Sequence, residues 1–247
     1  MVSILGSSAS GLAHNQFVLD VVGNNIANVD TFGFKKFRAV AEGRPDAAAT
    51  PESSRLGVAE STNDLVFSPA APQADDNPLH FSIQDDTFFK VLDSDGSTAY
   101  TRFGQLSVDS AGNITAYGGR LLDPPQSLPP DLLQPSMSPS GEITAVDAQG
   151  ARQVVGQLNT YRFMNPQGLQ TIGDGLYRET ANSGDVTEGT PGVDGFAELV
   201  PGTLEGSNVD VAEEFTNMII AQRAYSACAK TFSVGDQMLE LATNLTQ

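Results

Sequence analysis

The chain has 247 residues, enough for one large or two ordinary domains with a sizeable core. Its 13 Lys+Arg against 30 Asp+Glu give a formal net charge of -17, which disfavours nucleic acid and anionic membrane surfaces, because both are bound mainly through cations placed on phosphate. A single cysteine excludes an internal disulfide. One cysteine and two histidines give little support to a metal or redox centre, so we expect no cofactor and no metal.

The N-terminal segment predicts a long helix from about residue 3 to residue 28. Apolar Leu5, Leu12, Leu19 and Ile26 recur every seven residues, the period of a coiled-coil stripe. The segment lacks a basic region followed by a long apolar run, and no later stretch approaches the ~18 apolar residues of a membrane span. If the protein leaves the cytoplasm, we therefore expect a route without a cleaved signal peptide, and we expect no direct membrane insertion.

The end of this helix carries an unusual run of amides in NNIANVDTFGFKKF, residues 24–37. A simple helix stop explains Asn28, with Gly33 in a left-handed turn. It leaves Asn24 and Asn25 without a role. We expect these two amides to donate and accept hydrogen bonds across a helix contact, where they would fix its register.

The residues after the turn are aromatic and basic. Phe34 is expected to tuck back onto the apolar face of the helix. Lys35, Lys36 and Arg38 are expected to meet the acidic surface of a neighbouring copy, a complementarity that specifies orientation more than affinity.

The middle of the chain changes from helical to strand-like patterns. Residues 42–76 are rich in Ala, Pro, Ser and acidic side chains without sustained periodicity, which indicates an extended arm or linker. Residues 77–203 alternate short strand-like runs with glycine-containing turns, which predicts an antiparallel β domain. The turns are DSDGS (93–97), DSAGN (109–113), SPSGE (138–142) and DAQGA (147–151). The proline-rich run DPPQSLPPDLLQP suits an extended crossing or edge strand.

The C-terminal segment predicts a second, longer helix from about residue 209 to residue 245. Ser207, Asn208 or Asp210 can cap its first amides. Such a length without a break favours assembly over an ordinary core helix. One set of positions recurs every seven residues: Val211, Met218, Tyr225, Phe232 and Leu239. A second set lies four residues after each of the first four of these: Phe215, Gln222, Ala229 and Asp236.

Catalytic or metal chemistry finds little support in the motifs. DSDGS resembles the opening of a calcium loop but lacks the third acidic position and the terminal glutamate, so a hairpin turn is favoured. Ser207 has no G-x-S-x-G elbow around it, and Cys228 has no histidine nearby in sequence. His14 is interpreted as a polar residue on a helix flank. We expect the protein not to be an enzyme.

These patterns predict an α+β fold in which long N- and C-terminal helices pair as a coiled-coil-like layer, with a central antiparallel β domain and an extended arm. The expected divisions are an N-terminal helix and turn (1–41), the arm (42–76), the β domain (77–203) and the C-terminal helix (204–247). Subunit contacts are expected at Leu5, Leu12, Leu19, Asn24, Asn25, Ile26, Asn28, Phe34, Val211, Phe215, Met218, Gln222, Tyr225, Phe232 and Leu239.

Nearly the whole chain resembles the bacterial flagellar rod and hook family. Ser10-Gly11-Leu12 followed by LDVVGNNIANVDTFGFKKFRAV is similar to the N-terminal signature of the family, and GTLEGSNVDVAEEFTNMIIAQRAYSACAKTFSVGDQMLELATNL is similar to its C-terminal segment. NPLHFSIQDDTFFKV, AYTRFGQLSVDSAGNITAYGGRLL and GLYRETANSGD are similar to its central β domain. The likeness is strongest to distal rod subunits, with a proximal rod or hook subunit as the alternative.

This resemblance implies a structural protein that polymerises helically through its terminal helices into a hollow shaft. Such a shaft would cross the periplasm in the flagellar basal body, transmit motor torque to the hook and leave a channel for export. The implied partners are further copies, other rod and hook subunits, the surrounding bushing rings and the flagellar export apparatus. The rival from another class is a secreted oligomeric β-domain binding protein, which a pocket with convergent titratable groups would favour.

Overall fold

A computed structural model of the chain describes residues 2–43, 58–93 and 95–244. The chain divides into two compact units. One, here called the helical unit, comprises Met1–Val29, Lys36–Val66 and Val209–Gln247. The other, here called the β unit, comprises Asp30–Lys35 and Phe67–Asn208. Among the described residues the protein is α+β, as predicted.

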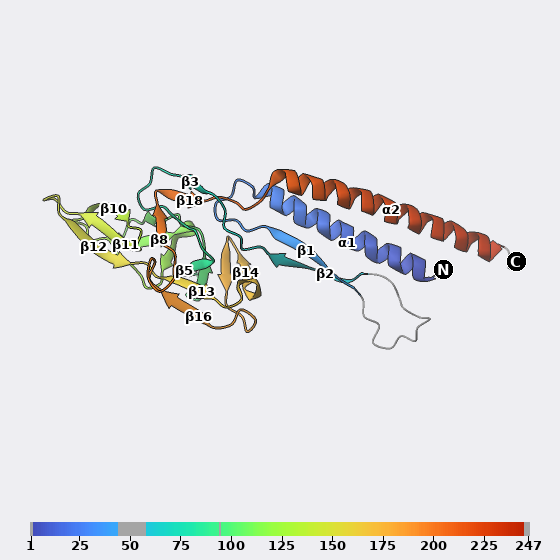
Figure 1. The fold of residues 1–247 in the computed structure, drawn as a ribbon, viewed down its shortest axis with the longest axis horizontal. Helices are drawn as coiled ribbons and strands as arrows, with labels where there is room; N and C mark the ends of the chain where they lie inside the picture. The colour runs from blue at the N-terminus through green and yellow to red at the C-terminus, as the bar shows by residue number, and fades with distance from the viewer. Residues whose placement is uncertain (1, 44–57, 94, 245–247) are drawn as a thin grey trace. The chain divides into compact units, whose positions relative to one another are not determined.

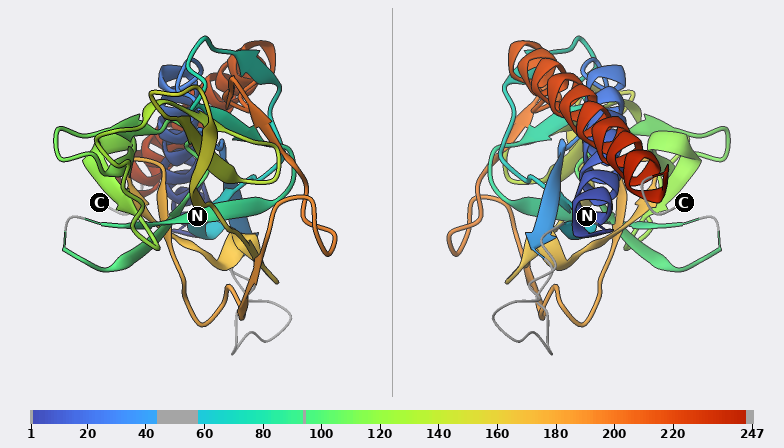
Figure 2. Two further views of the ribbon diagram at one scale, coloured as in Figure 1. Left: turned by 90° about the vertical axis from the view of Figure 1, so that its left-hand side faces the viewer. Right: turned by 90° about the vertical axis from the view of Figure 1, so that its right-hand side faces the viewer.

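The helical unit combines two long helices with a strand ribbon. It contains α1 (Val2–Ala27), α2 (Val211–Asn244), β1 (Phe37–Gly43) and β2 (Val58–Leu65), and the two strands pair antiparallel. The helices lie side by side, and the ribbon packs against α1 (Figure 1). Figure 2 (right) looks along this helix pair and shows α2 crossing in front of α1. Both predicted helices are confirmed, with ends within two residues of the expected ones.

The start of α2 is fixed by one of the three candidate caps. Asp210 accepts hydrogen bonds at Oδ1 from the backbone N–H groups of Ala212 (2.8 Å) and Glu213 (3.2 Å). An aspartate at this position satisfies amides that have no partner within the helix and places negative charge at the positive end of the helix dipole. This local chemistry explains why α2 begins at Val211.

Within its described residues the β unit contains sixteen strands: β3 (Pro72–Ala74), β4 (Phe81–Ile83), β5 (Thr87–Leu92), β6 (Thr98–Thr101), β7 (Ser107–Val108), β8 (Ile114–Ala116), β9 (Arg120–Leu122), β10 (Leu133–Met137), β11 (Glu142–Val146), β12 (Arg152–Gln157), β13 (Thr160–Phe163), β14 (Gln170–Gly173), β15 (Leu176–Arg178), β16 (Val186–Gly189), β17 (Leu199–Pro201) and β18 (Thr203–Glu205). Short 3-10 helices cover Tyr117–Gly119 and Pro166–Gly168. Across the part of the chain that the structure describes, every strand pairing is antiparallel.

The strands of the β unit form one large sheet and smaller ones. The large sheet has nine strands in the order β14-β15-β6-β5-β9-β8-β7, with β13 joined to β5 and β16 to β13. A three-stranded sheet has the order β10-β11-β12, and two-stranded pairs join β17 to β4 and β18 to β3. Figure 2 (left) views this β-rich part end on. The core packs against the large sheet around Phe81, Phe89, Leu106 and Ile114.

The four predicted glycine turns are confirmed at their described residues, which leave out residue 94 of the first turn. They connect β5 to β6, β7 to β8, β10 to β11 and β11 to β12, and each of these pairs is antiparallel. The glycines Gly96, Gly112, Gly141 and Gly150 all have positive φ, between 79° and 86°. Glycine reaches this conformation without the steric cost that a Cβ imposes. The proline-rich run ends in β10, an edge strand of its sheet, as expected.

The expected arm of residues 42–76 contains regular structure. Its residues 58–65 form β2, paired with β1, and its residues 72–74 form β3, paired with β18. Residues 44–57 of the expected arm lie outside the described residues. The arm therefore contributes a strand to each of the two units.

Three charged side chains are buried together in the β unit. Lys35, Arg102 and Glu205 are each only 1% exposed. The Nζ of Lys35 donates to Oε1 of Glu205 at 2.6 Å, and Arg102 donates to the same carboxylate through Nε (2.9 Å) and Nη2 (3.1 Å). Burial, assisted by the nearby Arg102 guanidinium, lowers the pKa of Lys35 to about 8 although Glu205 opposes the shift.

The lowered pKa of Lys35 predicts a rise in stability with pH. Between pH 8 and 10.5 the unfolded chain retains the lysine proton that the folded chain has released, so the free energy of unfolding increases across this window. We expect a gain of about 1 to 2 kcal/mol between roughly pH 7.5 and 9.5, absent from Lys35→Met. Urea unfolding at each pH measures it. Lys36→Met should keep the wild-type slope, and a Lys35→Met slope equal to wild type would contradict the prediction.

Candidate assembly surface

The contact between α1 and α2 follows two opposed rows of residues. Asn25 on α1 donates from Nδ2 to Oε2 of Glu214 on α2 at 3.2 Å. A Cβ at Gly11 would lie 3.0 Å from the Sγ of Cys228. These two contacts are fourteen residues apart on both helices (11 to 25 and 214 to 228), which equals two heptads, and the numbers run in opposite directions. The helices therefore run antiparallel with matched heptad spacing.

Small residues make this contact close. On α2 the row continues through Ala221, which is buried, and Gly235, where a Cβ would lie 2.9 Å from a methyl group of Leu5. Side chains this small let two helix backbones approach each other. Sequence reasoning centred the helix stripe on larger residues and missed this row. The signal was present in Ala221, Cys228 and Gly235, small residues spaced by seven.

Asn25 links three segments of the helical unit. Besides its bond to Glu214, its Nδ2 donates to the carbonyl of Phe37 at 2.8 Å, and its Oδ1 accepts from the N–H of Phe37 at 2.9 Å. Asn25 is 1% exposed and Glu214 is also buried. The side-chain amide of Asn25 thus bonds both backbone groups of Phe37 in β1, as a neighbouring strand would, and also bonds Glu214 in the first turn of α2.

The other two amides of the run bond to each other. Asn24 is exposed, and Asn28 donates from Nδ2 to the carbonyl oxygen of Asn24 at 2.8 Å and to its Oδ1 at 3.1 Å. These bonds satisfy acceptors in the last turn of α1, where the helix leaves carbonyls without internal partners. Asn25 thus bonds to α2 through Glu214, whereas these two bonds of Asn28 reach the last turn of α1.

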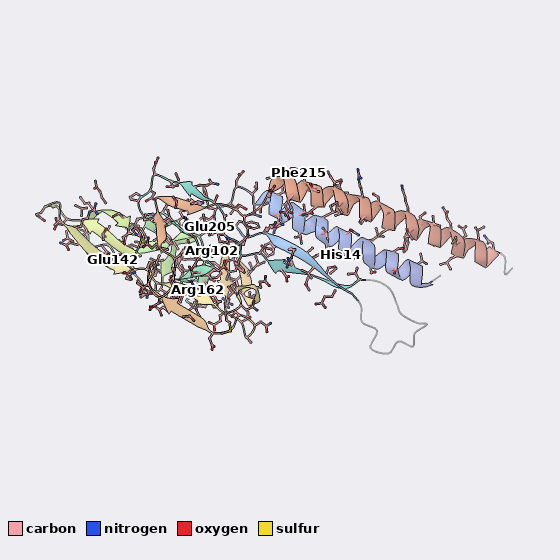
Figure 3. All side chains as sticks on the ribbon, viewed as in Figure 1. His14, Arg102, Glu142, Arg162, Glu205 and Phe215 are labelled. Carbon is pink, nitrogen blue, oxygen red and sulfur yellow. The ribbon has the colours of Figure 1, made fainter. Side chains whose placement is uncertain are left out.

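The other residues predicted at subunit contacts fall into two groups by exposure. Half-buried residues are Leu5, Leu12, Leu19 and Ile26 on α1, Met218 and Leu239 on α2, and Phe34 in the β unit. Exposed residues are Gln222 together with Val211, Phe215, Tyr225 and Phe232, the last four between 39% and 50% exposed. Figure 3 labels Phe215 near the start of α2. Further exposed apolar residues on α2 are Ile219, Ile220, Val234, Met238 and Leu241.

These exposures mean that large apolar side chains on α2 remain uncovered by α1 at positions from Val211 to Leu241. Large contiguous apolar patches are rare on monomeric proteins and mark surfaces that bind a partner. The exposed aromatics Phe215, Tyr225 and Phe232 have the residue types that dominate the energetics of buried contacts.

A groove of about 430 Å³ lies in the helical unit, lined by α1, α2 and β1. Its lining includes the apolar residues Val18, Val22 and Ala221. His14 also lines the groove, and its Nδ1 lies 2.9 Å from the hydroxyl oxygen of Ser61. Figure 3 places His14 on α1. The expectation that His14 is a polar residue on a helix flank agrees with this contact.

The prediction for Lys35 is wrong. Its side chain is buried in the β unit against Glu205, so its charge is not available to a neighbouring copy. Lys36 pairs with Glu213 at 2.8 Å in the helical unit, and Arg38 pairs with Asp64 at 3.3 Å on the ribbon. The basic residues after the turn therefore make pairs within their own units, since acidic partners lie close to each of them.

The described ranges 2–43, 58–93 and 95–244 contain neither a cluster of metal ligands nor a membrane-spanning helix. No three His, Cys, Asp or Glu side chains there are grouped so that they could hold a metal ion. No helix within those ranges combines the length and the apolar character needed to cross a membrane.

Comparisons with known protein families match the chain in three places. The models match as follows: "Flagella basal body rod protein" at residues 5–35, "Flagellar hook protein FlgE/F/G D1 domain" at 82–145, and "Flagellar basal body rod FlgEFG protein C-terminal" at 200–245. The first match covers most of α1 and the last covers all of α2, the two helices of the candidate assembly surface.

Curated relatives match along the full length. The flagellar basal-body rod protein FlgG of Bacillus subtilis is 36% identical over 99% of both chains, and that of Caulobacter vibrioides is 35% identical over 98% of both. The flagellar hook protein FlgE of Borreliella burgdorferi is 43% identical, over 41% of this chain and 23% of its own length. The solved structure of Helicobacter pylori flagellar hook protein FlgE2 is 15% identical over 69% of this chain and 43% of that one, with a TM-score of 0.26, too low to establish a shared fold.

Proposed function

This chain belongs to the family of the flagellar basal-body rod protein FlgG, a structural rod subunit, and we propose that its copies polymerise through the helices of the helical unit. The observation that carries the proposal is the set of exposed aromatic and aliphatic side chains on α2. Their burial against neighbouring copies gains about 25 cal/mol for each Å² of apolar surface removed from water. Assembly thereby buries what the single chain leaves in solvent.

We propose that α1 and α2 pair as a coiled coil within each subunit. The two-heptad spacing between the Asn25–Glu214 and Gly11–Cys228 contacts supports this pairing. The residues predicted at the subunit interface then divide by role. Those on α2 that α1 leaves exposed, such as Phe215 and Phe232, contact neighbouring copies.

Contacts between two different surfaces of one chain generate a helical filament when the rotation between copies does not close into a ring. We propose that the filament is a hollow shaft, the distal rod, which transmits motor torque to the hook and leaves a channel for export. Segments 1–41 and 204–247 line the channel, the arm of 42–76 contacts neighbouring copies, and 77–203 is the β domain. The rod is favoured over the hook because the match to FlgE reaches only 23% of that protein.

We also propose partners and a location for this chain. The partners are other rod and hook subunits, the rings that surround the rod and the flagellar export apparatus, through which the chain passes without a cleaved signal peptide. The proposed location is the periplasmic part of the basal body. We assign it no enzymatic role, since the family consists of structural rod proteins.

Electron microscopy of the purified chain at rising concentration tests this function. Tubes or protofilaments are expected above a threshold concentration, because helical polymers grow only when subunit addition outweighs dissociation. Discrete small oligomers at every concentration would overturn the proposal and favour an oligomeric binding protein.

A further inference from the structure

The chain passes between the two units four times, after residues 29, 35, 66 and 208. Inside the β unit these passages begin or end at Asp30–Lys35, at Phe67 and at Asn208. Load carried along the covalent chain from the helices enters the β unit through these segments. Their attachment inside the β unit is therefore mechanically important for a rod subunit.

All of these segments are tied to Glu205, at the end of β18. Its backbone carbonyl accepts the N–H of Gly33 at 2.7 Å, and its carboxylate accepts Nζ of Lys35 at 2.6 Å. The same carboxylate accepts the N–H of Ala70 at 3.1 Å. Every one of these bonds lies within the β unit.

Further bonds join the segments to one another. The N–H of Asn208 donates to the carbonyl of Phe34 at 3.4 Å, and its Nδ2 donates to the carbonyl of Ser68 at 3.2 Å. Lys35 also donates from Nζ to that carbonyl of Ser68, at 2.8 Å. The three segments thus form one network rather than three separate attachments.

Arg102 connects this network to the sheet. It binds both carboxylate oxygens of Glu205, and its remaining N–H groups donate to the carbonyls of Asp85 (2.7 Å), Thr87 (2.9 Å) and Ile83 (3.4 Å), at β4 and β5. Arg102 and Glu205 are labelled in the β unit in Figure 3. A bidentate guanidinium–carboxylate pair is directional, so it resists the sliding that an apolar contact permits.

We propose that Lys35, Arg102 and Glu205, here called the clasp, fasten all four chain passages as one unit and transfer mechanical load from them to the large sheet. This role rests on the proposed function of a rod subunit. Buried ion pairs contribute little net stability, yet removing one partner is costly because an uncompensated charge remains. The clasp therefore releases all its segments together instead of one at a time.

Hydrogen exchange of the unassembled chain tests whether the clasp acts as one unit. Glu205→Gln keeps the shape of the side chain and removes its charge. We expect exchange at the amides of Gly33, Ala70 and Asn208 to accelerate together by about tenfold or more, while Ile114 in the core is unchanged. Acceleration at Ala70 alone, which bonds the altered carboxylate directly, would overturn the proposal.

Two further variants complete this test. Glu213→Gln removes a charge that is 54% exposed and paired with Lys36, and it should leave all four amides unchanged. If Glu205→Gln fails to fold, Lys35→Met, which keeps the pair of Arg102 and Glu205, is measured in the same way. Accelerated exchange at both Gly33 and Asn208 would support the clasp, and no change at either would refute it.

The stiffness of assembled tubes tests the transfer of load. The persistence length of Glu205→Gln tubes is expected to fall by about threefold or more while the threshold concentration for assembly stays at the wild-type value, because α2 is unaltered. Unchanged stiffness would refute the mechanical role. Absence of wild-type tubes would refute the proposed function and this role with it, whereas the exchange experiment would still decide whether the clasp is one unit.

Discussion

Phe232→Asp is expected to abolish polymerisation while the β unit stays folded. Phe232 is 41% exposed in the single chain, so a carboxylate there remains hydrated before assembly. In the proposed polymer the same position is buried against a neighbouring copy. Burying an unpaired carboxylate costs on the order of 3 kcal/mol or more, and each ~1.4 kcal/mol is a factor of ten in affinity. The threshold concentration should rise by about a hundredfold or more.

Sedimentation of polymer from monomer over a concentration series measures this threshold, and near-ultraviolet circular dichroism reports on the aromatic core of the β unit. Ser233→Asp is the matched control. It introduces the same charge at the next residue of α2, which is also exposed but lies about 100° further round the helix. Normal polymerisation of Phe232→Asp would remove α2 from the proposed interface.

Asn25→Leu is expected to destabilise the helical unit by about 3 kcal/mol. The substitution removes the three hydrogen bonds that Asn25 makes with Glu214 and with both backbone groups of Phe37. Each lost bond within a buried site costs about 1 kcal/mol or more, since the remaining partner stays desolvated. The buried carboxylate of Glu214 loses the amide that faces it and adds to this cost.

Urea unfolding followed by far-ultraviolet circular dichroism measures this loss, because nearly all the helix of the chain belongs to this unit. Asn24→Leu serves as the control, since Asn24 is exposed and its side chain accepts one bond from Asn28. We expect its effect to stay within about 0.5 kcal/mol. Equal losses for the two variants would show that the amide run acts only as a helix stop.

Much of the fold could be predicted from local patterns in the sequence. The seven-residue repeats predicted α1 and α2, and glycine turns such as the one at Gly96 predicted the hairpins of the β unit. These features depend on the conformational preferences of short segments, so neighbouring residues suffice to specify them. The family signature, too, is a property of the sequence, and full-length relatives agree with it.

The candidate site was less accessible to sequence reasoning. A heptad repeat shows that a helix has an apolar stripe, but it does not show which partner covers that stripe. On α2 the row that meets α1 contains Ala221 and Cys228, whereas the larger Phe215 and Phe232 remain exposed. Close approach of two backbones requires small side chains, which a search for large apolar residues passes over.

By itself the sequence determined the two helices, the antiparallel β domain and membership of a rod family. Only the tertiary structure decided that Asn25 meets Glu214, 189 residues away, and that Lys35 is buried against Glu205, 170 residues away. The physical reason is that a polar side chain has several possible partners of suitable chemistry along the chain. Which of them it meets, and whether its charge stays in solvent, depends on how distant segments pack together.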